Sequence, residues 1–211
     1  MTKLDEIAIN IELVLISLIE GVALVTLAEH SVDLLQGPEA FWYLPYILSG
    51  LLIILVFWAQ SIMHALSFIR WPLNMWHMFL YFFAAFLQIV AYGAIEDKLM
   101  WFFWWTIFTL VGLGMYVLDL KVLQQMRSRL GNDYINKIEE RHRYEMRVLI
   151  PAALVFNLAM LLLTAVFPAW FESGFLFALP AILQLLVSCV ALYDCVNNFN
   201  ARSVLIARIQ D

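Results

Sequence analysis

The sequence has little charge for its length. Only 14% of its 211 residues are Asp, Glu, Lys or Arg, whereas a soluble domain carries about 25%. It also lacks a glycine-rich phosphate-binding motif and any zinc-type spacing of cysteine and histidine. Hydrophobic residues make up 64% of the chain, more apolar surface than one water-soluble core can hide. The shortage of charge therefore predicts a membrane protein.

Cysteine is scarce, and no chemistry beyond packing is predicted for it. Cys189 and Cys195 are six residues apart in one apolar run, a rotation of about 240° on a helix, so they cannot easily pair with each other. We interpret them as small buried residues, with a redox role as the alternative. The sequence has no basic face that would indicate nucleic-acid binding. It also has no nucleophile paired with a base that would indicate an enzyme. We predict no metal and no cofactor; a haem held between His64 and His77 is the alternative considered.

Six apolar runs are each long enough to cross a bilayer as a helix, which takes about twenty residues. They span about 7–27, 41–68, 74–95, 99–122, 148–167 and 175–196. The polar stretch with His30, Asp33, Gly37 and Pro38 predicts a loop, and Glu96 to Lys98 a tight connection. The first run is too long for a cleavable signal peptide. We predict an all-α polytopic membrane protein: one domain over 1–211 with six transmembrane helices.

The basic residues predict the orientation. With the N-terminus inside, Lys98 alone falls outside, and the inner side receives Lys3, Arg70, Lys121, Arg127, Arg129, Lys137, Arg141, Arg143, Arg147, Arg202 and Arg208. The positive-inside rule then predicts that both ends lie in the cytoplasm. Aromatic residues at the span ends, among them Tyr46, Trp101 and Trp105, are predicted at the outer interface, with Trp71 and Trp76 at the inner one.

Residues 123–147 predict a cytoplasmic helical extension. Gly131 and Asn132 are typical of a helix end followed by an N-cap. Ile135, Ile138, His142, Met146 and Leu149 then recur at helical spacing, and Glu139 and Arg143 form an i,i+4 pair. The fifth helix should begin about ten residues before the membrane and pack against an extension of the fourth. A solvated helix and a docking site for a partner protein both remain open.

The first helix carries an unusual polar arc. On a helical wheel, seven residues of this helix fall within an arc of about 100°, and two of them are Gly21 and Ala28. The other five are the candidate pore-lining residues: Asn10, Leu13, Ser17, Glu20 and Leu24. Central Glu12 and Glu20 cost about 2.5–3.5 kcal/mol each, which cancels most of the about 4–8 kcal/mol gained by the Ile, Leu and Val residues. The arc should therefore face protein or water. Packing on neighbouring helices and lining a water-filled path between subunits are both open.

Other polar residues in the runs have ordinary interpretations. Four uncharged polar residues lie in mid-span and predict interhelical hydrogen bonds: Gln60, Gln88, Asn157 and Gln184. Asp119 and Asp194 lie near the inner helix ends. We interpret both as boundary residues that reach water.

The chain resembles the transmembrane protein 175 family of potassium channels. The resemblance rests on Phe57–Trp58, Phe68–Ile69–Arg70, Trp76 at the third helix, Arg147 and Pro151 at the fifth helix, and Phe167–Pro168–Ala169–Trp170 at its end. It implies a tetramer in a bacterial plasma membrane, with first helices that line a pore for a monovalent cation. The family's Arg and Phe-Ser-Asp signature is missing, since Lys3 is followed by Ile7, Ala8 and Ile9.

The expected function is therefore a homo-oligomeric cation channel, with potassium the ion that the resemblance implies, lined by the first helix. Two alternatives stand beside it. One is a non-conducting membrane subunit or anchor that binds a partner through residues 123–147. The other is a small proton- or cation-coupled transporter in which Glu20 binds the ion in mid-membrane.

Overall fold

The computed structural model describes residues 3–66, 75–130, 133–172 and 174–210. Every element in these ranges is a helix: α1 Lys3–Gln36, α2 Ala40–Leu66, α3 Met75–Gly93, α4 Lys98–Leu130, α5 Asp133–Tyr144, a π-helical turn Glu145–Leu149, α6 Ile150–Val166, a short 3-10 helix Pro168–Phe171 and α7 Gly174–Gln210. Six stretches within the described residues are long and apolar enough to cross a membrane. The all-helical class and the six candidate spans are thus as predicted.

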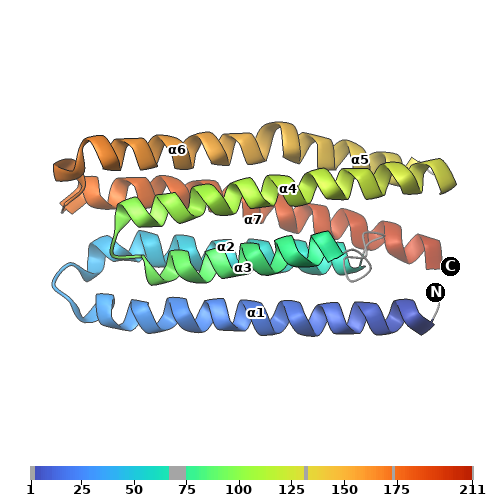
Figure 1. The fold of residues 1–211 in the computed structure, drawn as a ribbon, viewed down its shortest axis with the longest axis horizontal. Coiled ribbons are helices and arrows are strands. Elements are labelled where there is room, and N and C mark those ends of the chain that lie inside the picture. The colour runs from blue at the N-terminus through green and yellow to red at the C-terminus, as the bar shows by residue number, and fades with distance from the viewer. Residues whose placement is uncertain (1–2, 67–74, 131–132, 173, 211) are drawn as a thin grey trace.

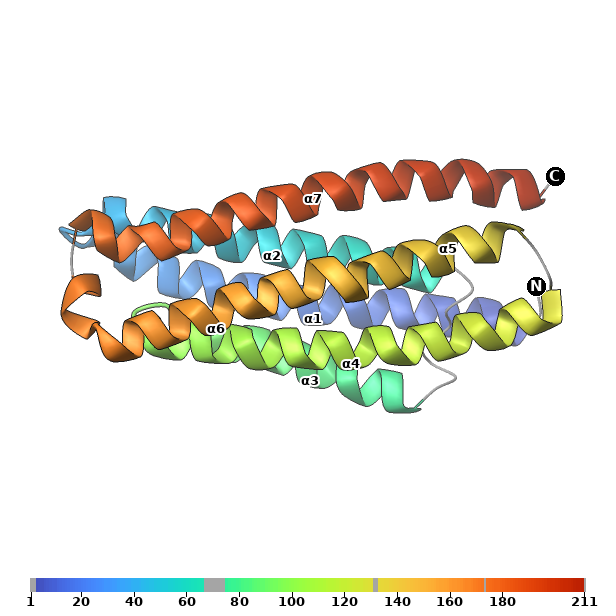
Figure 2. The same cartoon turned by 90° about the horizontal axis from the view of Figure 1, so that it is seen from above.

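The helices run side by side along one axis, and both termini lie at the same end of the bundle (Figures 1 and 2). We call this the terminal end. α1 packs against α2 and α3, α2 packs against α7, α3 against α4, and α4 against α6. The connections between α1 and α2 and between α3 and α4 lie at the opposite end, as an up-and-down bundle with short loops requires.

α1 is longer than the sequence predicted. The expected loop from His30 to Asp33 is helical, and α1 ends only at Gln36, before Gly37 and Pro38. The polar composition was misleading because this part of the helix still packs on the bundle. Ser31 and Leu34 are buried, and the Ser31 hydroxyl donates a hydrogen bond to the Leu27 carbonyl at 2.6 Å. The short α3–α4 connection is as predicted: Asp97 caps α4, accepting from the Met100 backbone N–H at 3.1 Å.

α5, the π turn and α6 form one continuous helix from Asp133 to Val166. As predicted, the fifth helix begins before Val148, and α5 packs against α4. The cytoplasmic position of residues 123–147 stays a prediction. The predicted helix end and N-cap, Gly131 and Asn132, lie outside the described residues. The π turn Glu145–Leu149 ends two residues before Pro151, which has no N–H to donate to the carbonyl four residues earlier. A widened turn accommodates that missing bond, and π turns of this kind often occur at functional sites.

The half of the bundle opposite the terminal end has an aromatic core. Tyr46, Tyr92, Trp101, Trp105 and Phe177 are each at most 2% exposed and contact one another mainly edge to face. The side chains of Tyr46, Trp101 and Trp105 therefore face the bundle interior rather than lipid. Their expected level at the outer interface stays a prediction. Each points into the bundle; the Trp101 indole N–H donates to the Gln184 amide oxygen at 2.8 Å and the Tyr46 hydroxyl to the Phe177 carbonyl at 2.9 Å.

Candidate functional site

A buried carboxylate joins three helices near the terminal end. Asp119 on α4 has no exposed surface, and each of its oxygens meets a buried histidine from another helix. Oδ1 lies 2.8 Å from Nε2 of His77 on α3, and Oδ2 lies 3.2 Å from Nε2 of His142 on α5. The interpretation of Asp119 as a boundary residue that reaches water is wrong, because α3 and α5 cover it completely.

The chemistry of a carboxylate fixes the protons on these rings. An ionised carboxylate only accepts hydrogen bonds, so both histidines donate through Nε2–H and a neutral ring leaves Nδ1 unprotonated. Nδ1 of His142 lies 3.7 Å from Oε2 of Glu145, and Nδ1 of His77 is buried without a hydrogen-bond partner among the described residues. Nδ1 is therefore the atom at which either histidine can take up a further proton.

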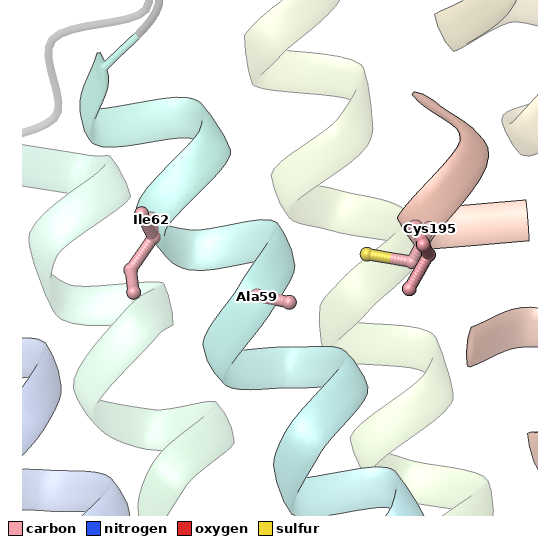
Figure 3. A pocket seen from close by; sticks show the side chains of 4 residues that line it. Ala59, Ile62 and Cys195 are labelled. Atoms are coloured by element: carbon pink, nitrogen blue, oxygen red, sulfur yellow. The ribbon is translucent and has the colours of Figure 1, made fainter. Parts of the chain in front are cut away.

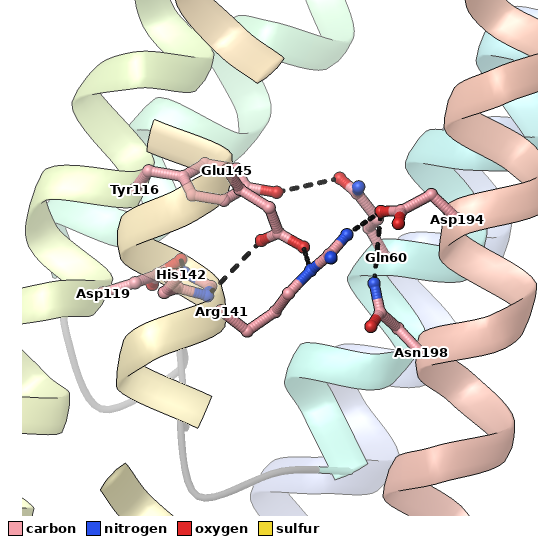
Figure 4. Close-up of polar contacts among 8 residues, drawn as sticks. All are labelled: Gln60, Tyr116, Asp119, Arg141, His142, Glu145, Asp194 and Asn198. Carbon is pink, nitrogen blue, oxygen red and sulfur yellow. Dashed lines mark hydrogen bonds and ion pairs between the residues drawn. The ribbon is translucent and has the colours of Figure 1, made fainter. Parts of the chain in front are cut away.

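The cluster continues toward α7 through one arginine (Figure 4). Glu145 is 7% exposed, and its Oε1 accepts from Nε of Arg141 at 3.0 Å. The guanidinium of Arg141 also pairs with Oδ2 of Asp194 on α7, and the same oxygen accepts from the Asn198 amide at 3.2 Å. Asp194 is therefore an ion-pair partner rather than a simple boundary residue. The pairing connects α5 to α7.

We call the set His77, Asp119, His142, Glu145, Arg141 and Asp194 the polar cluster. With neutral histidines it holds three carboxylates and one guanidinium. Asp119 and Glu145 are buried, whereas Arg141 and Asp194 are partly exposed. Donors from His77, His142 and Arg141 face the two buried carboxylates, which lowers the cost of burying their charge.

Neighbouring groups hold His142 in place. Its ring stacks on Tyr116 of α4 with centroids 4.6 Å apart and planes 23° apart, and the Tyr116 hydroxyl donates to Gln60 of α2 at 3.4 Å. The π turn begins at Glu145, three residues after His142. Tyr116 thus packs against the His142 ring, and Gln60 of α2 holds Tyr116 in turn.

A line of polar side chains runs from the cluster along α3. His77, Tyr81, Gln88 and Tyr92 are all buried and fall within a helical arc of about 60°. The Gln88 amide donates to the Tyr92 hydroxyl at 2.9 Å, and that hydroxyl donates to the Gly50 carbonyl of α2 at 3.0 Å. Gln88 lies about 16 Å beyond His77 along the helix axis. We call these four residues the α3 polar face.

The five predicted pore-lining residues of α1 do not share one environment. Asn10, Ser17 and Leu24 are exposed on the outer face of the helix, and Leu13 is half-buried against neighbouring apolar side chains. Glu20 is only 4% exposed and points into the bundle, close to Gln88 and Tyr92. Within one subunit, Glu20 is therefore separated from the exposed residues of the predicted arc.

The predicted interhelical hydrogen bonds form in three of four cases. Gln184 bonds to Trp101, Gln60 to Tyr116, and the Asn157 amide donates to Thr109 of α4 at 3.1 Å. Gln88 differs, because its amide donates along its own helix to Tyr92. The predicted pair on α5 is also present: Arg143 Nε donates to Glu139 at 3.0 Å.

An apolar groove of about 250 Å³ lies between α2 and α7, lined by Ala59, Ile62, Cys195 and Val196 (Figure 3). It presents no polar side chain to a ligand. Neither Cys189 nor Cys195 forms a disulfide bond. Cys195 is buried as expected, but Cys189 is exposed, so its interpretation as a buried residue is wrong. The side chain of His64 lies outside the described residues, and His77 is bonded to Asp119. Among the described residues, no cluster of three or more His, Cys, Asp or Glu side chains is arranged to hold a metal ion.

No protein-family model, curated protein or solved structure matches the chain. The candidate site therefore rests on geometry alone. Sequence reasoning missed it because its members come from four helices separated along the chain. One signal was visible: His77, Asp119 and Asp194 fall inside predicted spans, where ionisable residues are expensive. His142 and Glu145 belong to the segment 123–147, which the sequence placed outside the spans.

Proposed function

We propose that this chain is an integral membrane protein that conducts protons through the interior of its helical bundle, with proton exchange at the polar cluster. The observation that carries the proposal is Asp119, a carboxylate without exposed surface that meets histidines of two other helices. Within membrane spans, chains of Asp, Glu and His are typical of proton relays. This proposal keeps the cation transport expected from the sequence and names the proton as the cation.

The location of the cluster supports the proposal. His77, Asp119, His142 and Asp194 lie near the terminal-end limits of their candidate spans. The basic residues gather at the same end, so the positive-inside rule would place the cluster near the cytoplasmic surface, with both termini inside. Arg141 and Asp194 are about one quarter to one third exposed. A proton could therefore enter from the cytoplasm at Arg141, Glu145 and Asp194 and reach His142 through its Nδ1.

The test is proton flux into proteoliposomes with a trapped pH-sensitive dye, driven by a potassium diffusion potential. Wild-type protein should acidify the lumen faster than protein-free liposomes, and Asp119→Asn should lose the difference. Asp33→Asn is the matched control, because Asp33 is exposed on α1 far from the cluster. Wild-type flux equal to that of empty liposomes, or an unchanged rate in a folded Asp119→Asn variant, would overturn the proposal.

A second proposal is the homo-oligomeric potassium channel lined by α1. Its support is the exposed outer face of that helix, where Asn10 and Ser17 lie among apolar residues and a Cβ added to Gly21 would meet no atom within 4 Å. A partner α1 could approach closely there. Potassium flux that changes with Ser17→Leu but is indifferent to Asp119→Asn would favour this channel over proton conduction.

The structure offers less support to an anchor that binds a partner through residues 123–147. The helical face with Ile138, Glu139 and His142 is buried within the chain itself. Arg141 and Arg143 are engaged with carboxylates of this chain. Among the residues of this segment whose exposure the structure describes, those that are exposed and open to a partner include Gln124, Glu140 and Tyr144.

A further inference from the structure

Glu20 is a further buried ionisable group, outside the polar cluster, and it forms no ion pair with any residue that the structure describes. It lies near the middle of α1, 17 residues after Lys3 and 16 before Gln36, about 24–26 Å from either end of the helix. The residue is 4% exposed, and neither carboxyl oxygen accepts a hydrogen bond from the described residues. A carboxylate in that position would be buried and poorly solvated.

The neighbouring helices hold no counter-charge for it. α1 packs chiefly against α2 and α3, and neither Ala40–Leu66 nor Met75–Gly93 contains Lys, Arg, Asp or Glu. Apart from tyrosines, the titratable residues of these helices are His64 and His77. His77 is bonded to Asp119, about 16 Å along α3 from Gln88. His64 is two residues from the end of α2, and Glu20 is near the middle of α1.

The polar groups near Glu20 are Gln88 and Tyr92 of α3. The Gly50 carbonyl can only accept, so Tyr92 donates its single proton there and its oxygen accepts from the Gln88 amide nitrogen. This fixes the orientation of the Gln88 amide and leaves Gln88 Oε1 buried without a donor. The Gln88 amide nitrogen has a second N–H that can approach Glu20, but the buried Gln88 Oε1 still has no donor among the described residues.

We propose that Glu20 binds a proton in the folded protein and is held as a neutral carboxylic acid beside Gln88. One proton removes the cost of the isolated charge and gives the carboxyl group an O–H donor in a region with unsatisfied acceptors. Proton occupancy at Glu20 does not depend on conduction. Gln88 lies on the same face of α3 as His77, about 16 Å along the helix axis. Glu20 would then also be an intermediate stage of transfer; that role rests on the proposed function.

Infrared spectroscopy of the full-length protein in liposomes tests the occupancy. A protonated carboxyl group gives a C=O stretching band that shifts on exchange into deuterium oxide. Wild-type protein at neutral pH should show the band, Glu20→Gln should lack it, and Glu29→Gln should keep it, because Glu29 is exposed on the same helix. Absence of the band in wild type, or its persistence in Glu20→Gln, would overturn the proposal. So would a carboxylate band that responds to added sodium or potassium, because the site would then hold a metal cation.

The flux assay separates this inference from the proposed function. Glu20→Gln conserves shape and should fold as the wild type does, with a thermal midpoint at or above the wild-type value. Its proton flux should fall to the level of empty liposomes if Glu20 is an intermediate stage. Unchanged flux in Glu20→Gln, with the infrared band lost, would overturn the relay role alone. Loss of flux in Asp119→Asn but not in Glu20→Gln would leave the polar cluster as the exchange site.

Discussion

Replacement of Asp119 should be the most destabilising single change in the polar cluster. In Asp119→Ala, the Nε2–H donors of His77 and His142 lose their shared acceptor in a region without water access. A buried donor without a partner costs about 1–3 kcal/mol. Two such donors predict a loss of about 2–6 kcal/mol in the free energy of unfolding.

Asp119→Asn should cost less than the alanine variant. Its amide oxygen can still accept from one histidine, and the other histidine can move its proton to Nδ1 and accept from the amide N–H. One bond to a charged group becomes a bond to a neutral one, a loss of about 1–2 kcal/mol. The free energy of unfolding should therefore be highest for the wild type, lower for Asp119→Asn and lowest for Asp119→Ala.

The assay is equilibrium unfolding in mixed micelles of mild detergent and sodium dodecyl sulfate, followed by tryptophan fluorescence and circular dichroism. Asp33→Ala provides the control at an exposed position of α1. The reasoning would be refuted if Asp119→Ala unfolded within about 0.5 kcal/mol of that surface control, the range typical of surface substitutions. Nitrogen-15 spectra of the two histidines should independently show Nε2 protonated and Nδ1 free at high pH.

The remaining predictions concern packing and the α5–α7 contact. Arg141→Gln should destabilise by about 1–3 kcal/mol more than Asp194→Asn in the same unfolding assay, because it leaves the buried Glu145 carboxylate unpaired; equal losses would contradict this. Gly50→Ala should cost about 1–3 kcal/mol, since its Cβ would lie 3.0 Å from Tyr92 and 3.2 Å from Leu27. Gly112→Ala, whose Cβ meets nothing within 4 Å, should be neutral or stabilising and serves as its pair. Gly174→Ala should lose about 1 kcal/mol or more, read as a lower thermal midpoint, because the residue has φ +72° at the start of α7.

Local patterns were a good guide to the helices. Runs of about twenty apolar residues predict spans because the bilayer sets their length, and the Pro38 and Pro168 positions mark helix ends because proline has no N–H to donate. The ends themselves were less predictable. α1 continues to Gln36 because Ser31 and Leu34 pack on other helices, which residue composition in a short window does not reveal.

The site was harder to foresee. Asp119 near a helix end is compatible with a side chain that reaches water, and nothing in the residues around it indicates that His77 and His142 will close over it. The wheel of α1 gave Glu20 and Ser17 the same arc, but they lie about 60° apart. The boundary between the buried and exposed faces falls between them, at a position set by how α2 and α3 meet α1.

The sequence alone determined that this chain is helical and apolar enough to cross a membrane six times, because hydrophobic length and proline position act over a single helix. Only the tertiary structure decided which ionisable groups share a buried site. Asp119, His77, His142 and Arg141 come together through contacts between α3, α4, α5 and α7. Those contacts depend on the rotation of each helix in the bundle, and that rotation is set by the packing of all the neighbouring side chains at once.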